Sequence, residues 1–166
     1  FLPHEHFVVA KSPGLEDDFY EKILNPYPNV SSVQNETYNL LNHAKAALVT
    51  SGTATLETAL FGVPEIVCYK GSNISYQIAK HLVKIKYISL VNLIMDHLVV
   101  KELIQDDLTV ENLRNELTGL LHNTQRRQQL QQDYASLKNI LSAGGDASAK
   151  AAKVIYKLAL PQKKIN

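Results

Sequence analysis

Short apolar runs alternate with helical segments in the first half of the sequence, and this alternation restricts the chain to few folds. The clearest example is the apolar run AALVT at 46–50, a helical pattern over 53–61, and a second apolar run at 65–69. Gly62 and Pro64 separate the helix from the second run, as expected where a helix ends. Strands joined by helices in this way are typical of a parallel, doubly wound α/β sheet.

The same patterns predict the remaining elements. Strands are expected at 6–11, 30–33, 46–50, 65–69 and 87–90, and helices at 15–24, 35–44, 53–61 and 74–83. The C-terminal third is expected to be helical, with helices at 99–105, at 108–122 with Thr109 as N-cap, at 124–141, and at 147–158 with Asp146 as N-cap. The fold class is therefore α/β with flanking helices and a helical C-terminal third.

Composition excludes several classes of protein. The length of 166 residues suits a single domain, and a net charge of +1 without a basic, aromatic-rich segment argues against nucleic-acid binding. The single cysteine, Cys68, lies in an apolar run, so we interpret it as a buried apolar residue. The histidines lack ligand spacing, so no metal site is predicted. No signal peptide and no membrane span are recognisable, and because the first residue is Phe1 rather than Met we expect a piece of a longer protein.

Small hydroxyl residues gather at the corner between the strand at 46–50 and the helix at 53–61. A helix N-terminus has unpaired N–H groups and a partial positive charge, and a glycine lets the backbone approach a ligand closely. In an open α/β sheet, ligands bind beyond the carboxyl ends of the strands. This corner is therefore a candidate phosphate cradle. Its residues are Ser51, Gly52, Thr53 and Thr55.

Glu57 extends this candidate site. It lies four residues after Thr53, so both side chains share one face of the helix. A carboxylate one turn from a phosphate site is suited to accept hydrogen bonds from a ribose diol. The alternative is that the hydroxyl residues only cap the helix, since Ser and Thr are common N-caps. Neither GxGxxG nor GxxxxGK[ST] occurs in the sequence.

Four segments carry a resemblance to a known family. They are SGTATLE at 51–57, GVPEIVCY at 62–69, ISYQIAKHLVKIKYISLVNLI at 74–94 and VKELIQDD at 100–107. Together they resemble the lipid-A-disaccharide synthases, bacterial glycosyltransferases, over residues 46–107. The resemblance implies the Rossmann-like C-terminal domain of a GT-B fold. It also implies transfer of a diacylated glucosamine from a UDP donor onto an acylated glucosamine phosphate, with inversion, release of UDP, and no cofactor or metal.

The resemblance also implies roles for individual residues. The corner residues would hold the donor diphosphate and Glu57 the ribose. Asn92, in SLVN, and Gln105, in KELIQ, match family positions near the donor, although Val91 replaces the usual proline. The full list of expected UDP-sugar contacts is Ser51, Gly52, Thr53, Thr55, Glu57, Asn92 and Gln105.

The family's acceptor-side domain, with its presumed general base, has no counterpart in this chain. The first strand of the C-terminal domain, with its glycine- and arginine-bearing loop, would also precede Phe1. We therefore expect a single partial domain, residues 1–166, that does not turn over alone. The resemblance also implies a cytoplasmic, peripheral protein on the inner face of the bacterial inner membrane. Lys80, Lys84 and Lys86 could face anionic headgroups there, or simply form the solvated face of a helix.

Two other functions fit the same scaffold. A UDP-sugar epimerase shares the small-residue corner and the helical glutamate, and would bind UDP without acting on a lipid. A non-catalytic interaction domain would use the long polar helices between 109 and 158 as its partner surface.

Overall fold

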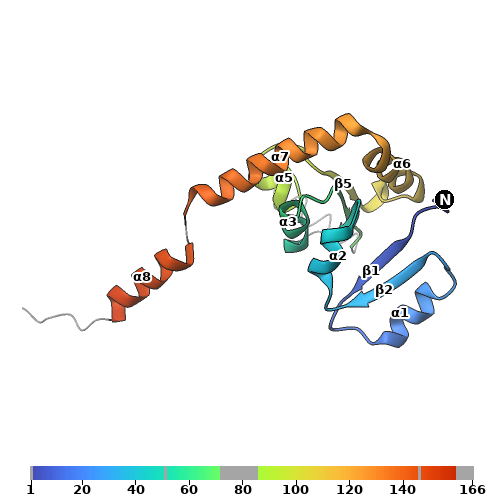
Figure 1. Cartoon of the computed structure of the whole chain (residues 1–166), viewed down its shortest axis with the longest axis horizontal. Helices are drawn as coiled ribbons and strands as arrows, with labels where there is room; N and C mark the ends of the chain where they lie inside the picture. The colour runs from blue at the N-terminus through green and yellow to red at the C-terminus, as the bar shows by residue number, and fades with distance from the viewer. Residues whose placement is uncertain (1, 51, 72–85, 146, 160–166) are drawn as a thin grey trace, which may run out of the picture.

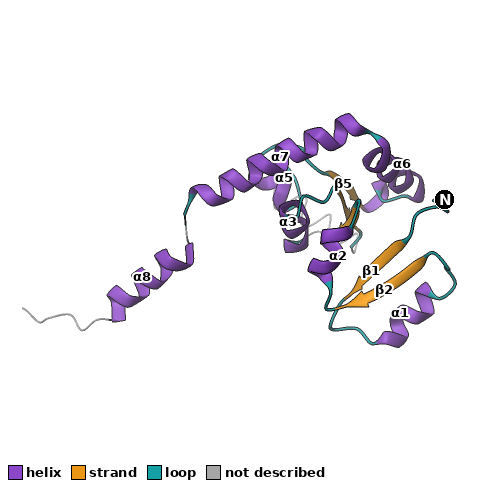
Figure 2. Cartoon of the chain, in the orientation of Figure 1, coloured by secondary structure: helices purple, strands orange, loops and turns teal. Residues whose placement is uncertain are grey.

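The computed structural model describes residues 2–50, 52–71, 86–145 and 147–159. Its strands are β1 (Phe7–Lys11), β2 (Val30–Gln34), β3 (Ala47–Thr50), β4 (Glu65–Tyr69) and β5 (Lys101–Ile104). Its helices are α1 (Asp17–Leu24), α2 (Thr37–His43), α3 (Thr53–Leu60), α5 (Leu90–Met95), α6 (Val110–His122), α7 (Thr124–Ala143) and α8 (Ala147–Ala159), and a 3₁₀ turn covers Gln105–Asp107. The structure is α/β, with parallel strands flanked by helices, as predicted (Figure 2).

The strands form two parallel sheets instead of one. β1 pairs with β2, and β4 lies between β3 and β5 in a three-stranded sheet. The Ala47 N–H donates to the Pro64 carbonyl oxygen at 2.8 Å, on the β4 side. Because successive residues of a strand direct their N–H groups to opposite sides, those of Leu48 and Thr50 face the other edge of β3. No strand in the described part of the chain pairs with that edge.

The core lies between the three-stranded sheet and the helices that cover it. Ile66 and Val67 of β4 are completely buried, and Leu120 of α6 and Leu137 of α7 are buried in the same cluster. Helix α8 extends away from this body, and its described side chains are exposed (Figure 1). No helix among the described residues is both long and apolar enough to cross a membrane.

Most predicted elements are confirmed, with shifts of at most two residues at their ends. Thr109 is the predicted N-cap of α6, and its hydroxyl oxygen accepts a hydrogen bond from the Asn112 N–H at 3.1 Å. The helix predicted at 74–83 and the cap predicted at Asp146 lie outside the described residues.

Two predictions are wrong, and they are adjacent. Residues 87–90 are not a strand: the chain turns there into α5, whose N-cap Ser89 accepts a hydrogen bond from the Asn92 N–H. Residues 99–105 are not a helix: β5 occupies Lys101–Ile104 and pairs with β4. In both places hydrogen bonds from distant residues determine the conformation, and the local pattern does not.

Candidate functional site

The carboxyl ends of three neighbouring parallel strands meet at one edge of the sheet. β3 ends at the corner before α3, β4 ends before Lys70 and Gly71, and β5 ends at the 3₁₀ turn. This edge is where open α/β sheets bind ligands. The candidate residues from the sequence therefore divide into those that reach this edge and those that do not.

The corner between β3 and α3 has an unusual backbone. Gly52 has a φ of 143°, a conformation that residues with a Cβ rarely adopt. Thr55 is completely buried, and its hydroxyl donates to the Gly52 carbonyl oxygen at 2.8 Å. Thr55 thus fixes the corner from within, whereas Thr53 is exposed. Ser51 lies outside the described residues.

Replacing Gly52 with alanine should lower the free energy of unfolding by about 1–3 kcal/mol, the usual cost of a non-glycine residue in a disfavoured backbone conformation. The cause is backbone strain alone, because a Cβ at Gly52 would meet no atom within 4 Å. Urea unfolding measures the change. Gly144→Ala is the control, since Gly144 has a φ of −69° and also has open space around it. Equal effects at both positions would contradict the proposed strain.

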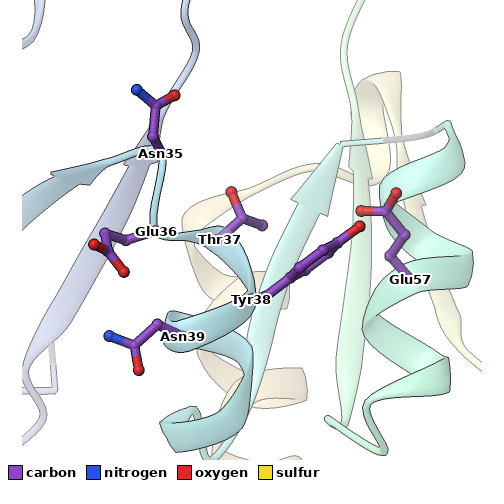
Figure 3. A pocket seen from close by; sticks show the side chains of 6 residues that line it. All are labelled: Asn35, Glu36, Thr37, Tyr38, Asn39 and Glu57. Atoms are coloured by element: carbon purple, nitrogen blue, oxygen red, sulfur yellow. The ribbon is translucent and has the colours of Figure 1, made fainter.

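Glu57 borders a hollow of about 430 Å³ between α2 and α3. The Tyr38 and Glu57 side chains point toward one another across it (Figure 3). The Tyr38 ring stacks on Phe61, with centroids 5.3 Å apart, and both rings remain partly exposed. The hollow therefore combines carboxylates, amides and an exposed aromatic face. Its lining residues are Asn35, Glu36, Thr37, Tyr38, Asn39 and Glu57.

Asn92 is completely buried, and both ends of its amide are hydrogen-bonded inside the protein. Its Oδ1 accepts from the N–H groups of Val99 and Val100 at 2.8 and 2.9 Å. Its Nδ2 donates to the Val100 carbonyl oxygen and to Glu102 Oε1. Asn92 thus joins α5 to the beginning of β5, the end opposite the candidate ligand edge.

Glu102 was not recognised as important from the sequence. Its carboxylate accepts hydrogen bonds from the backbone N–H groups of Ile88 and Ser89 at 2.9–3.1 Å, and from Asn92 at 2.8 Å. It therefore holds the turn that leads into α5. The sequence shows only that Glu102 follows Lys101 in a short segment of mixed polarity, and this does not identify its partners.

Gln105 follows β5 and is only 6% exposed. Its Oε1 accepts from the Gly71 N–H at 2.7 Å, and its Nε2 donates to the Gly71 carbonyl oxygen at 3.2 Å. Its own backbone has a φ of 50°. Gln105 thus contacts the segment that follows β4, and this segment lies at the candidate edge.

Three further features to consider are the lysines, the cysteine and the groups that could bind a metal. Lys86 forms an exposed ion pair with Asp96 at 3.3 Å, and Lys80 and Lys84 lie outside the described residues. Burial raises the pKa of the Cys68 thiol, so a reactive thiolate is disfavoured there. Among the described residues, no group of three or more His, Cys, Asp or Glu side chains could hold a metal ion.

Comparison with known proteins gives one family. The sequence model described as "Lipid-A-disaccharide synthetase" matches residues 5–157. A protein named "Lipid-A-disaccharide synthase" from Acidobacterium capsulatum is 41% identical over 119 residues, which cover 71% of this chain and 30% of that protein. One of the same name from Geobacter sulfurreducens is 32% identical over 157 residues, 94% of this chain and 41% of the relative.

A third protein of this name, from Syntrophus aciditrophicus, is 38% identical over 128 residues, 77% of this chain and 33% of the relative. The chain thus spans about a third of the length of the curated relatives it matches.

Proposed function

The chain belongs to the lipid-A-disaccharide synthase family, and we propose that it is the part that binds the nucleotide-sugar donor. The observation that carries this proposal is the hollow beside Glu57 of α3, the helix that begins after the Gly52 corner at the carboxyl edge of the sheet. A nucleoside diphosphate needs donors for its phosphates, an acceptor for its ribose diol and an apolar face for its base. The start of α3 offers the donors, Glu57 the acceptor, and Tyr38 in the hollow the aromatic face.

In this proposal the nucleoside occupies the hollow. Glu57 accepts hydrogen bonds from the ribose hydroxyls, and the exposed face of Tyr38 packs against the base, because aromatic rings stack on bases at little geometric cost. Asn35 and Asn39 also line the hollow, but their side-chain amides point away from Glu57 (Figure 3). The diphosphate then extends toward Gly52 and Thr53.

The remaining candidates are Thr55, Asn92 and Gln105. In this proposal they do not contact the donor but hold the backbone around its site. Thr55 fixes the corner, and Asn92 and Gln105 fix two of the segments around β5. This assignment follows from their burial and from their hydrogen bonds within the protein.

The complete reaction requires more than these residues provide. We propose that the donor is a UDP-diacylglucosamine and the acceptor an acylated glucosamine phosphate, joined with inversion and release of UDP. A base must remove the proton of the acceptor hydroxyl, and we assign it to the part of the protein that the longer relatives contain and this chain does not. The lipid substrates imply work at a membrane surface, which we place at the cytoplasmic face of the inner membrane.

We further propose that a strand from the same protein joins the two sheets. The edges of β1 and β3 each lack a strand partner among the described residues, and both strands are parallel to their neighbours. A parallel strand between them would give one continuous sheet and would cover edges that otherwise invite association. It would match the first strand that the family resemblance predicts.

The epimerase and the non-catalytic alternatives receive no support from a particular observation. Each of the three relatives described above is named as a synthase.

Replacing Glu57 with alanine should weaken UDP binding by about 1–3 kcal/mol, because the ribose hydroxyls lose a charged partner. Titration of the protein with UDP, followed by calorimetry or amide NMR shifts, measures this change, and adenosine diphosphate tests selectivity for the base. The matched control is Glu21→Ala, an exposed glutamate on α1. An unchanged affinity in Glu57→Ala would remove this residue from the ribose role.

A further inference from the structure

Lys70 directly follows β4 at the candidate edge. In the parallel pair β3 and β4, Thr50 lies opposite Cys68. Lys70 and Gly52 therefore follow the carboxyl ends of two neighbouring parallel strands, and such strands lie about 4.8 Å apart. Both residues are thus at the edge of the sheet where the diphosphate of the proposed donor would lie.

The charge of Lys70 is available there. The side chain is exposed, and no hydrogen bond or ion pair joins it to another described residue. Some other cations are engaged with acids, as Lys11 is with Asp17 and Arg126 with Glu116. Of the three residues after each of β3, β4 and β5, those in the described ranges include one cation, and it is Lys70.

The chain that carries Lys70 is held from both sides. Gln105 binds the N–H and the carbonyl oxygen of Gly71, the next residue, and does so from a left-handed backbone conformation. The Tyr69 side chain lies close over Gly71. A Cβ added at Gly71 would be only 2.9 Å from the tyrosine oxygen. Gln105 is buried, has a disfavoured backbone conformation and is hydrogen-bonded to Gly71. It therefore fixes the loop that contains Gly71.

We propose that Lys70 binds the diphosphate of the nucleotide donor and that Gln105 is the positioning residue that holds it there. The inference rests on the proposed function, and it adds the positive charge that the corner itself lacks. Two of the residues around the hollow, Glu36 and Glu57, are acids and would repel a diphosphate unless a cation were placed between. A lysine ammonium serves this purpose as a point charge.

The same charge would also favour the transfer. The acceptor oxygen forms its bond to the anomeric carbon while the bond from that carbon to the phosphate oxygen breaks. The electron pair stays on the phosphate oxygen, the hydroxyl proton goes to the base, and UDP leaves with one more negative charge. Lys70 lies where this charge develops.

The test compares UDP binding by the intact protein and its variants over a range of salt concentrations. Lys70→Met should weaken binding about 10- to 100-fold, the range for losing a charge-assisted hydrogen bond, and should reduce the salt dependence of affinity. Lys70→Arg should retain most of the affinity. Lys138→Met, at an exposed lysine of α7, is the matched control and should bind UDP as the unmodified protein does.

Gln105→Ala should also weaken UDP binding. Thermal unfolding is measured in parallel to detect a damaged fold. If the unmodified protein binds UDP and Lys70→Met binds it equally well, the inference is overturned while the proposed function stands. If the unmodified protein does not bind UDP at millimolar concentration, both are overturned. An equal loss in Lys70→Met and Lys70→Arg would also contradict it, because the charge would then not be the cause.

Discussion

Replacing Glu65 with methionine should stabilise the protein at pH 8 by about 3–5 kcal/mol, an unusually large gain for a single substitution. Glu65 is the first residue of β4 and is completely buried. Neither of its carboxyl oxygens has a hydrogen-bond partner among the described residues. Burial raises its pKa from the ordinary 4.5 to about 9, so the folded protein holds it as a neutral acid.

The surroundings of Glu65 explain why no partner neutralises it. Tyr134 of α7 is the nearby polar side chain, but its hydroxyl donates to the Val63 carbonyl oxygen at 3.2 Å. Burial, together with the nearby Glu65, also raises the pKa of Tyr134. Methionine is unbranched and flexible, is somewhat larger than glutamate, and has no polar group to desolvate, so it leaves no cavity at the site.

The same cause predicts a pH dependence. Between pH 4.5 and about 9 the folded state keeps the Glu65 proton and the unfolded state loses it. Because the folded state binds more protons, the free energy of unfolding falls as pH rises, by up to about 1.4 kcal/mol per pH unit. Glu65→Met should remove this part of the slope.

Urea unfolding at several pH values from 5 to 9 measures both effects. Glu21→Met, at an exposed position of α1, controls for the change of residue type and should leave the slope unchanged. Parallel slopes for Glu65→Met and the unmodified protein would contradict a buried neutral acid at this position.

The sequence predicts best where local signals agree. The apolar runs at β3 and β4, with Gly62 and Pro64 between them, identify that strand–helix–strand unit, and Thr109 identifies the start of α6. The sequence fails around β5, whose four residues include two charges and adopt a strand because they pair with β4. No pattern within the segment contains that information.

The candidate site shows the same contrast between residues that the sequence predicts and residues that it does not. The spacing of Thr53 and Glu57 on one helix is local, and the sequence predicts that they share a face. Tyr38 and its neighbours reach the hollow only through the packing of α2 beside α3, so spacing along the chain does not find them. The sequence does not indicate Lys70 because its place at the same edge as Gly52 depends on which strands are neighbours.

Asn92→Ala should lower the free energy of unfolding by about 3 kcal/mol, because four hydrogen bonds inside the protein are lost at a buried position. Asn92→Asp should cost at least as much, since it places a second carboxylate beside Glu102. Urea unfolding measures both changes. Asn42→Ala, at an exposed position of α2, is the control and should change stability by less than about 0.5 kcal/mol.

The family resemblance places Asn92 near the donor, and the structure gives it a different immediate task, so a double-mutant cycle with Glu102→Gln can separate the two roles. If Asn92 acts by joining α5 to β5, the two substitutions together should cost less than the sum of their separate costs, by about 1 kcal/mol or more. UDP affinity should then fall only as far as the turn at Ile88 and Ser89 is disturbed.

If Asn92 instead contacts the donor, Asn92→Ala should reduce UDP affinity while stability and coupling to Glu102 stay nearly unchanged. The hydrogen bonds of its amide favour the first outcome, because a side chain that already satisfies four partners has little capacity left for a ligand.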